Sequence, residues 1–377
     1  MVTTTAKTTP ADIKELMEYR YLGNTGLKVS VIGFGNMIVN HNGDPQKTTN
    51  ELVKKCLDYG INYFDTAEFY DDGNAETYLG TALKTLKVDR KDIVISTKLM
   101  FGTGRIFNEF TPPPTVIGLS RKHVIEGALR SLRKLQTNYV DIIFGSRLDQ
   151  ATPMEEICKA FSWLVDKGYA LYWGISEWPV EATMEAIKLC HEKGLNPPIT
   201  EQAQYSMLSR QRFEGEYRTL FEKFKFGATV WSPLASGLLT GRYNDGNTPD
   251  DSRFVENPHF GHFVLGQHFN PSNKEKNVKM LKDLAKYSKE LGYTQTQLAL
   301  AWALASRDVS TLILGFSKIS YIDENLKSLE LYKKWTKEIE QRCETILGNQ
   351  PQSTFNFITA RPNPSRRAQA VNEHLNE

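Results

Sequence analysis

Short apolar runs alternate with longer segments of helical spacing along most of the 377-residue chain. Eight runs rich in apolar and β-branched residues have the length of buried strands, and they span residues 29–35, 61–66, 92–98, 139–145, 170–176, 198–204, 228–233 and 310–317. Helical spacing follows them at residues 46–59, 75–87, 121–136, 154–167, 180–193, 215–225, 294–305 and 319–329. Parallel strands need crossover connections, usually helices, and strands that are apolar throughout are typical of burial on both faces. The pattern therefore predicts an α/β fold, a (β/α)8 TIM barrel, over residues 18–350.

An open, doubly wound sheet is the alternative architecture for strands that alternate with helices. Its dinucleotide-binding form places G-x-G-x-x-G after the first strand. The chain has "GFGNMI" at residues 33–38, where the third glycine is missing. The motif therefore favours the barrel and leaves the open sheet as the second choice.

Four segments do not follow the alternating pattern. Residues 1–17 and 351–377 are polar and are expected to be flexible N-terminal and C-terminal tails. Residues 99–119 contain "TPPPT", and residues 235–275 are rich in Gly, Asn, Asp and Pro. Both segments follow strands, so in a barrel we expect them to be loops at the C-terminal face, where active sites lie.

Composition excludes several classes of protein. Hydrophobic residues make up 40% of the chain, charged residues 24%, and the net charge is only +2, so charge gives no reason to expect a nucleic-acid partner. No 18-residue apolar run is present, and the first 17 residues have no apolar core of a secretory signal. We therefore expect a cytoplasmic protein.

Cysteines and histidines do not have the spacing of a metal site. The four cysteines are far apart, without CxxC or Cys/His spacing, and we interpret all of them as reduced thiols: Cys56, Cys158, Cys190 and Cys343. Three histidines of the 235–275 segment, His259, His262 and His268, have no Cys or carboxylate at ligand spacing. We expect that segment to be a mobile lid, with no metal.

Polar groups that could move a proton follow three neighbouring strands. Asp65 and Tyr70 come after the second run, Lys98 ends the third, and Ser146 follows the fourth. A nearby ammonium favours the phenolate of a tyrosine and makes it a usable proton donor, while an aspartate holds the lysine charged. These residues predict a centre for carbonyl reduction. The alternative is structural: Asp65 caps a turn, Tyr70 packs, and Lys98 is solvated.

Residues after the last two strands suggest a site for an anion and a flat ring. The segment "WSPLASGLLTGRY", residues 231–243, offers an aromatic ring, hydroxyls, small residues and Arg242, and Arg253 follows. Ser317 and Lys318 lie between the eighth run and a helix start, where backbone N–H groups bind phosphate. The alternative is an ordinary capped helix with surface cations.

Together, several motifs resemble the aldo-keto reductase superfamily and, within it, the β-subunits of voltage-gated (Shaker-type) potassium channels. The motifs are "RYLGNTGLKVSVIGFG", "FDTAEFYDDGNAE", "VISTK", "GLSRKHVIEGALRSLRKLQTNYVDIIF", "TPMEEI", "LYWGISEW", "WSPLASGLLTGRY" and "ILGNQP". The resemblance implies a TIM barrel that holds NADP(H), reduces small aldehydes and ketones slowly, and forms a homotetramer beneath the cytoplasmic tetramerisation domain of a channel alpha subunit. It thus implies a cytoplasmic protein that is peripheral to the membrane through its partner.

The resemblance also assigns roles to residues by position. Tyr70 would be the acid, supported by Lys98 and Asp65, while Ser176 and Gln202 would contact the nicotinamide amide. The pyrophosphate, 2′-phosphate and adenine would meet Trp231, Ser232, Pro233, Leu234, Ala235, Ser236, Arg242, Arg253, Gly315, Ser317, Glu324 and Asn325.

This chain departs from the family pattern at the catalytic centre. Ordinary aldo-keto reductases have His at the end of strand four and animal channel β-subunits have Asn, whereas this chain has Ser146. A hydroxyl can donate one hydrogen bond to a carbonyl, but it lacks the acid–base range of imidazole. Because losing one such donor typically costs about 10²- to 10³-fold in rate, we expect slow turnover.

Other departures fall on the cofactor side. Asn36 and Met37 replace the family's "TW", and Arg242 replaces a Lys. Glu177 stands where animal members have Arg and plant relatives have Glu, and its charge could weaken the attraction for cofactor phosphates. Tyr321 replaces a Gln and could stack on the adenine.

Three functions fit these residues. We favour a regulatory channel β-subunit that binds NADPH and has weak reductase activity, since the family-specific motifs and Ser146 occur together. A free-standing NADPH-dependent aldehyde reductase would also retain Asp65, Tyr70 and Lys98. A redox-inert scaffold is supported only by Ser146 and Glu177. The sequence does not identify the substrate.

Overall fold

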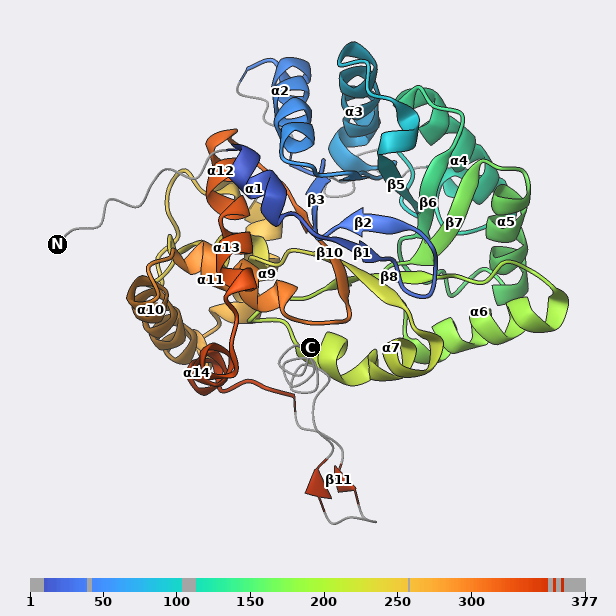
Figure 1. Ribbon diagram of the computed structural model, residues 1–377. Helices are drawn as coiled ribbons and strands as arrows, with labels where there is room; N and C mark the ends of the chain where they lie inside the picture. Colours follow the sequence, from blue (N-terminus) through green and yellow to red (C-terminus); the bar gives the residue numbers. More distant parts are fainter. Residues whose placement is uncertain are drawn as a thin grey trace.

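Eight parallel strands close into a barrel in the computed structural model, which describes residues 10–38, 43–103, 113–256, 258–351, 355–356 and 361–362 (Figure 1). The strands are β3 (Ile32–Gly35), β4 (Tyr63–Asp65), β5 (Val94–Leu99), β6 (Val140–Gly145), β7 (Ala170–Ile175), β8 (Thr200–Gln204), β9 (Gly227–Trp231) and β10 (Val309–Leu314). They follow one another around the barrel, and β10 pairs with β3 through Leu312 and Ile32. The predicted TIM barrel is confirmed. The open sheet is wrong, because its outer strands would remain unpaired.

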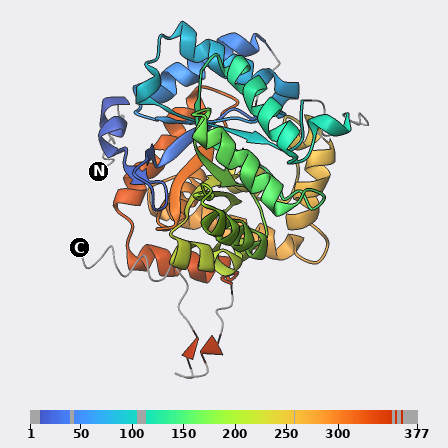
Figure 2. The ribbon, with the colours of Figure 1, turned by 90° about the vertical axis from the view of Figure 1, so that its right-hand side faces the viewer.

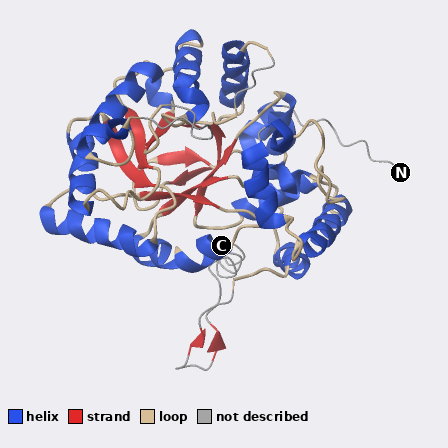
Figure 3. Cartoon of the chain, turned by 180° about the vertical axis from the view of Figure 1, so that it is seen from behind, coloured by secondary structure: helices blue, strands red, loops and turns tan. Residues whose placement is uncertain are grey.

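Helices surround this barrel on its outer side (Figures 2 and 3). Those that follow predicted strands are α2 (Pro45–Asp58), α3 (Asn74–Thr85), α4 (Arg121–Leu135), α5 (Met154–Asp166), α6 (Val180–Lys193), α7 (Arg218–Phe224), α11 (Gln295–Leu304), α12 (Ser320–Leu326) and α13 (Ser328–Lys333). Capping residues define several of their starts. Ser120 accepts the N–H of His123, and Thr294 forms a reciprocal capping box with Gln297. Each predicted helix is present, with ends that shift by a few residues.

One end of the barrel is closed by an antiparallel hairpin, β1 (Tyr19–Tyr21) and β2 (Lys28–Ser30). Its Leu22 and Val29 are fully buried in a cluster with Tyr63, Val94 and other residues inside the barrel. Tyr63 and Val94 begin their strands, so the hairpin covers the N-terminal end. The run at residues 29–35, which we predicted as one strand, is divided between β2 and β3. A functional site is therefore confined to the C-terminal ends of the strands.

Several elements were not predicted. Residues 10–16, which we assigned to the N-terminal tail, form α1 (Pro10–Leu16), and Ile13 is 1% exposed. The 235–275 segment is not a plain loop: it contains a 3-10 turn η5 (Ala235–Thr240), α8 (Arg253–Glu256) and α9 (Pro258–His268). Two polar helices, α10 (Lys274–Glu290) and α14 (Lys337–Leu347), complete the outer layer. Both of these helices bury apolar residues, among them Leu281 and Leu284 of α10 and Leu347 of α14.

Some expectations concern residues outside the described part of the chain. Residues 1–9, 104–112 and most of 351–377 belong to this group, although β11 (Phe355–Asn356) and β12 (Arg361–Pro362) form a short antiparallel pair. Within the described ranges, no helix is long and apolar enough to cross a bilayer. The same residues include no cluster of three or more His, Cys, Asp or Glu side chains suited to a metal ion.

Candidate active site

A buried ion pair lies where β4 and β5 end. The Nζ of Lys98 is 2.5 Å from Oδ2 of Asp65, and both side chains are only 2% exposed. Lys98 also donates to the carbonyl of Thr66 at 2.7 Å, while Asp65 Oδ1 accepts from Ser96 at 2.6 Å and Gln202 at 3.0 Å. Buried charges persist when they are paired and hydrogen-bonded in this way. The alternative in which Lys98 is a solvated strand end is therefore wrong.

Tyr70 lies beside this pair. It begins the 3-10 turn η1 (Tyr70–Gly73), is half-buried, and has its ring centroid 4.9 Å from Nζ of Lys98. Burial raises the pKa of Tyr70, Lys98 opposes the rise, and the net pKa is above its ordinary value. We expected Lys98 to lower the pKa of Tyr70. Lys98 does act in that direction, but the rise caused by desolvation is larger than the lowering by Lys98. Tyr70 therefore keeps its proton at neutral pH.

The lysine keeps its charge despite its burial. Burial alone would lower the pKa of Lys98, but Asp65 and Tyr70 raise it, and the net pKa lies above the ordinary value. The centre thus combines a cationic lysine, a carboxylate beside it, and a protonated tyrosine whose ring centroid is 4.9 Å from the ammonium. This is an arrangement in which a phenol can give up a proton while the ammonium stabilises the phenolate that remains.

Ser146 immediately follows β6 and is 3% exposed. Its N–H donates to the carbonyl of Leu99 at 2.9 Å, which fixes its backbone next to the end of β5. Arg147, which the sequence analysis missed, donates to the Ser146 carbonyl at 2.6 Å and to Oγ of Ser176 at 3.2 Å. Arg147 also opposes the rise in the pKa of Tyr70. Its position next to Ser146 at a strand end was the only signal in the sequence.

The residues predicted to meet a nicotinamide lie together at the ends of β7 and β8. Oγ of Ser176 donates to the carbonyl of Gln202 at 2.9 Å, and the Gln202 amide donates to Asp65. Asn36, after β3, is buried: its N–H donates to the Asp65 carbonyl and its amide to that of Ala75. Met37 is 41% exposed. All of these residues except Met37 are thus linked to the buried centre.

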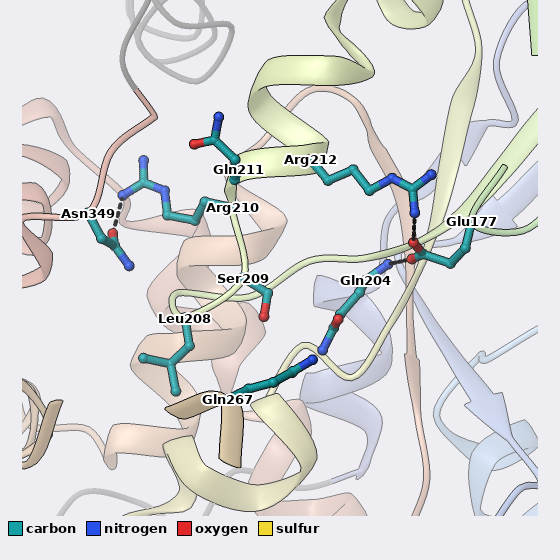
Figure 4. Close-up of a pocket in the computed structure, with 9 residues that line it drawn as sticks. All are labelled: Glu177, Gln204, Leu208, Ser209, Arg210, Gln211, Arg212, Gln267 and Asn349. Carbon is teal, nitrogen blue, oxygen red and sulfur yellow. Dashed lines mark hydrogen bonds and ion pairs between the residues drawn. The ribbon is translucent and has the colours of Figure 1, made fainter. Parts of the chain in front are cut away.

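Glu177 is not the free negative charge that we expected. Its Oε2 lies 2.5 Å from a guanidinium nitrogen of Arg212, and its Oε1 accepts the N–H of Gln204 at 2.6 Å (Figure 4). The same Oε1 accepts the indole N–H of Trp231 at 3.1 Å. Glu177, Gln204 and Arg212 border a cavity of about 330 Å³. Because Arg212 neutralises the carboxylate, Glu177 exerts little net repulsion on phosphates. It connects the ends of three strands instead.

Unfavourable backbone conformations gather around this site. Nine non-glycine residues among those described have a left-handed φ, and three of them lie at the ends of helices. The other six follow barrel strands: Asp71, Asp72, Glu177, Ser232, Ala235 and Ser236. Such conformations cost about 1–2 kcal/mol each and persist where the surroundings enforce them. They mark the C-terminal face of the barrel as a constrained functional surface.

The predicted phosphate-binding residues form a more open region. Ser232 and Ser236 have their hydroxyl oxygens 3.4 Å apart in a turn where Ser232, Ala235 and Ser236 have a left-handed φ. Successive backbone N–H groups in turns can form anion-binding concavities. Arg242 is 41% exposed and pairs with Asp251. Of the other residues predicted to bind phosphate, Trp231 ends β9, Pro233 and Leu234 stand between the two serines, and Arg253 begins α8. Gly315 and Ser317 follow β10, which pairs with β9 in the barrel.

Helix α12 carries the residues expected at an adenine. Tyr321 is half-buried, with Nζ of Lys318 located 5.8 Å from its ring centroid. Glu324 has its carbonyl held by the amide of Gln297 at 2.9 Å, and Asn325 is buried. The helix is thus anchored to α11 beside the barrel.

The fold and site define a class of protein: a TIM barrel whose strand ends hold a buried Asp–Lys pair beside a tyrosine. A model of the aldo/keto reductase family matches residues 31–345 of the sequence. The chain therefore belongs to the aldo/keto reductase family, as its motifs predicted.

Within that family, the chain is similar to proteins that carry the provisional name of voltage-gated potassium channel subunit beta. One, from Schizosaccharomyces pombe, is 42% identical over 334 residues, which cover 88% of this chain and 94% of the relative. Another, from Oryza sativa subsp. japonica, is 37% identical over 90% of this chain and 100% of the relative. A third, from Arabidopsis thaliana, is 38% identical over 89% and 98%, respectively.

Proposed function

We propose that this protein is an NADPH-dependent reductase of aldehydes and ketones that serves as the cytoplasmic β-subunit of a voltage-gated potassium channel. The observation that carries the catalytic half of the proposal is the intact centre of Asp65, Lys98 and Tyr70, buried and hydrogen-bonded at the strand ends. The channel half is supported by the names of relatives that are 37–42% identical over nearly the whole chain.

The residues present suit a nicotinamide nucleotide. The left-handed turn at Ser232–Ser236, its hydroxyls and the exposed Arg242 supply donors for phosphates. Ser176 and Gln202 would hold the carboxamide end near Asp65, and Tyr321 would stack on the adenine. When bound, NADPH would supply a hydride to the substrate carbonyl.

The chain's own residues supply the proton and its stabilisation. Tyr70 donates its phenolic proton to the carbonyl oxygen, and the charged Lys98 stabilises the phenolate that forms. Asp65 holds that ammonium group in place through the 2.5 Å contact. Arg147 adds a second positive charge to the centre, whose effect on Tyr70 has the same sign as that of Lys98.

Slow turnover follows from Ser146. A hydroxyl at this position can donate one hydrogen bond to the substrate oxygen, but it supplies neither the reach nor the charge of an imidazole. We therefore expect single-turnover rates about 10²- to 10³-fold below those of a reductase with histidine in its place. Such a rate suits a subunit whose bound nucleotide reports redox state to its partner. The homotetramer is proposed from the family resemblance alone.

A single-turnover experiment tests the catalytic half. The protein is loaded with NADPH, 4-nitrobenzaldehyde is added in excess, and the loss of nicotinamide absorbance is followed for the wild type and Tyr70→Phe. We expect slow oxidation that falls at least 10²-fold in Tyr70→Phe, with the Kd for NADPH unchanged. No oxidation in the wild type, with NADPH bound, would contradict reductase activity.

Channel association is tested separately. Co-expression with a tetrameric voltage-gated potassium channel alpha subunit, followed by co-purification and current recording, should yield a complex whose gating shifts with the NADPH/NADP⁺ ratio. Reductase activity without any complex would favour the alternative, a free-standing NADPH-dependent aldehyde reductase, which the intact centre also supports.

A further inference from the structure

A second buried acid, Glu68, lies two residues before Tyr70 on the loop that follows β4. Its side chain is only 2% exposed. One oxygen, Oε1, accepts the backbone N–H of Met100 at 2.8 Å and of Gly102 at 2.9 Å. The same oxygen lies 3.1 Å from Nε2 of His123, which is fully buried on α4. A single carboxylate therefore joins two catalytic-face loops and a helix.

The two N–H groups that Glu68 accepts stand on either side of Phe101. A residue with both neighbours hydrogen-bonded to one buried oxygen has little backbone freedom. The N–H of Gly118 additionally donates to the carbonyl of Met100 at 2.7 Å, which holds the same turn from its other face. The backbone at Phe101 is consequently held at the rim of the barrel, although the loop continues beyond it.

Phe101 is linked to Tyr70 by a chain of ring contacts. The rings of Phe101 and Phe69 are 5.1 Å apart at 82°, and those of Phe69 and Tyr70 are 4.7 Å apart at 81°. Both are edge-to-face contacts, which are favourable and geometrically specific. All three rings are half-buried. They form a partly exposed aromatic face that begins at the proton donor.

Two glycines near Glu68 show that the backbone around it is tightly packed. A Cβ on Gly102, whose φ is +69°, would lie 2.3 Å from the carbonyl oxygen of Val116. A Cβ on Gly127 of α4 would lie 3.0 Å from the side chain of Leu99 and 3.3 Å from Oε2 of Glu68. Gly102 thus lets its loop approach the backbone of Val116, and Gly127 lets α4 approach the Glu68 carboxylate, more closely than a residue with a side chain would.

We infer that Glu68 is a positioning residue that holds Phe101 against the Phe69–Tyr70 turn, so that Phe101 forms a wall of the carbonyl site. Glu68 touches no reacting atom and acts through Phe101. The effect on catalysis rests on the proposed reductase activity. The hydrogen bonds from Met100 and Gly102 to Glu68, which we call the clamp, do not depend on that activity.

The clamp is tested by hydrogen exchange on the full-length protein loaded with NADPH. In Glu68→Ala, amide exchange in residues 99–103 should accelerate at least tenfold, because Met100 and Gly102 lose their acceptor. Glu68→Gln, whose amide oxygen can still accept, should restore most of the protection. Glu126→Gln, on the exposed face of α4, is the matched control. Unchanged exchange in this segment, or equal acceleration throughout the barrel, would overturn the clamp.

The consequence is tested by kinetics with a large and a small aldehyde, 4-nitrobenzaldehyde and propanal. Phe101→Ala and Glu68→Ala should each raise KM for 4-nitrobenzaldehyde about 3- to 10-fold and change KM for propanal less than twofold. The double variant should resemble Phe101→Ala alone, since Glu68 acts through that ring. Multiplicative effects, or equal losses with both aldehydes, would overturn the inference. A wild type without turnover would refute the proposed reductase instead, while the exchange experiment would still decide the clamp.

Discussion

The two halves of the candidate site are built differently. At the ends of β4 and β5, Asp65 and Lys98 are 2% exposed and joined by direct side-chain contacts. After β9 and β10, Arg242, Gly315 and Ser317 are exposed, and left-handed backbone at Ser232–Ser236 shapes the region. The half that we propose to handle the proton is held by buried strands. The half that we propose to bind the nucleotide relies on constrained turns that remain open to solvent.

The difference follows from what each half must do. A proton donor needs neighbours whose charges and distances do not change, and buried strands supply that rigidity. A nucleotide site needs surface for a long ligand to enter, so its donors cannot all be buried. Substitutions should therefore affect stability in the first half and affinity in the second, and four experiments test this division.

The largest effect should come from Lys98→Met. Removing the ammonium leaves the Asp65 carboxylate buried without its partner, and we expect the free energy of unfolding to fall by about 3–5 kcal/mol. Lys91→Met, which removes the cation of the exposed Asp89 pair, should cause no measurable loss. Urea unfolding of both variants measures the difference. Equal stability of Lys98→Met and wild type would mean that Asp65 is not held as a buried charge.

Glu201→Gln should change the pH dependence of stability. Burial and, next, the nearby Glu177 raise the pKa of Glu201 well above its ordinary 4.5, so the folded protein holds this proton above the pH at which the unfolded chain releases it. The wild type should therefore lose stability relative to Glu201→Gln as pH rises above about 4.5, by up to ~1.4 kcal/mol per pH unit. Chemical unfolding between pH 4 and 8 measures this, with Glu192→Gln on the surface of α6 as control. If the free energies of unfolding of wild type and Glu201→Gln depend on pH in the same way, Glu201 is ionised in the folded protein.

Arg242→Ala should affect the nucleotide-binding half alone. Loss of an exposed cation should raise the Kd for NADPH about 5- to 10-fold at low salt, with a smaller change in high salt. The melting temperature without nucleotide should stay the same. Fluorescence titration measures the Kd, and Lys188→Ala on α6 controls for net charge. A large loss of stability in Arg242→Ala would break the proposed division of the site.

The smallest effect should come from Ser146→Ala. If the hydroxyl donates one neutral hydrogen bond to the substrate oxygen, its removal should slow single-turnover reduction only about 2- to 10-fold. Stopped-flow absorbance with the NADPH-loaded protein gives the rate. A loss of rate above 10²-fold would show that Ser146 contributes more to catalysis than one neutral hydrogen bond.

The barrel and its central residues were accessible from the sequence for a physical reason. Eight apolar runs define buried parallel strands, and the C-terminal ends of such strands share one face. Asp65, Tyr70 and Lys98 therefore had to meet once the strands were recognised. Helices α10 and α14 were missed because neither follows a predicted strand, so both lie outside the strand–helix alternation on which the prediction depended.

The alternation of apolar and polar residues does not predict contacts between distant segments of the chain. The charge of Glu177 was misjudged because its neutralising partner, Arg212, lies 35 residues away. Arg147 and Glu68 were overlooked because their roles arise from acceptors and donors on neighbouring loops. The sign of the net pKa shift of Tyr70 likewise depends on how deeply it is buried, which no spacing of residues reveals.

Barrel closure has a consequence for how the protein is made. Ile32 of β3 pairs with Leu312 of β10, 280 residues later in the chain. At ribosomal rates of about 5–20 residues per second, β3 waits roughly 15–60 s for its neighbour to be synthesised. During that time its backbone donors and acceptors are open to pairing with other nascent chains. Production should therefore depend on chaperones that bind the growing chain, more than the stability of the finished barrel would suggest.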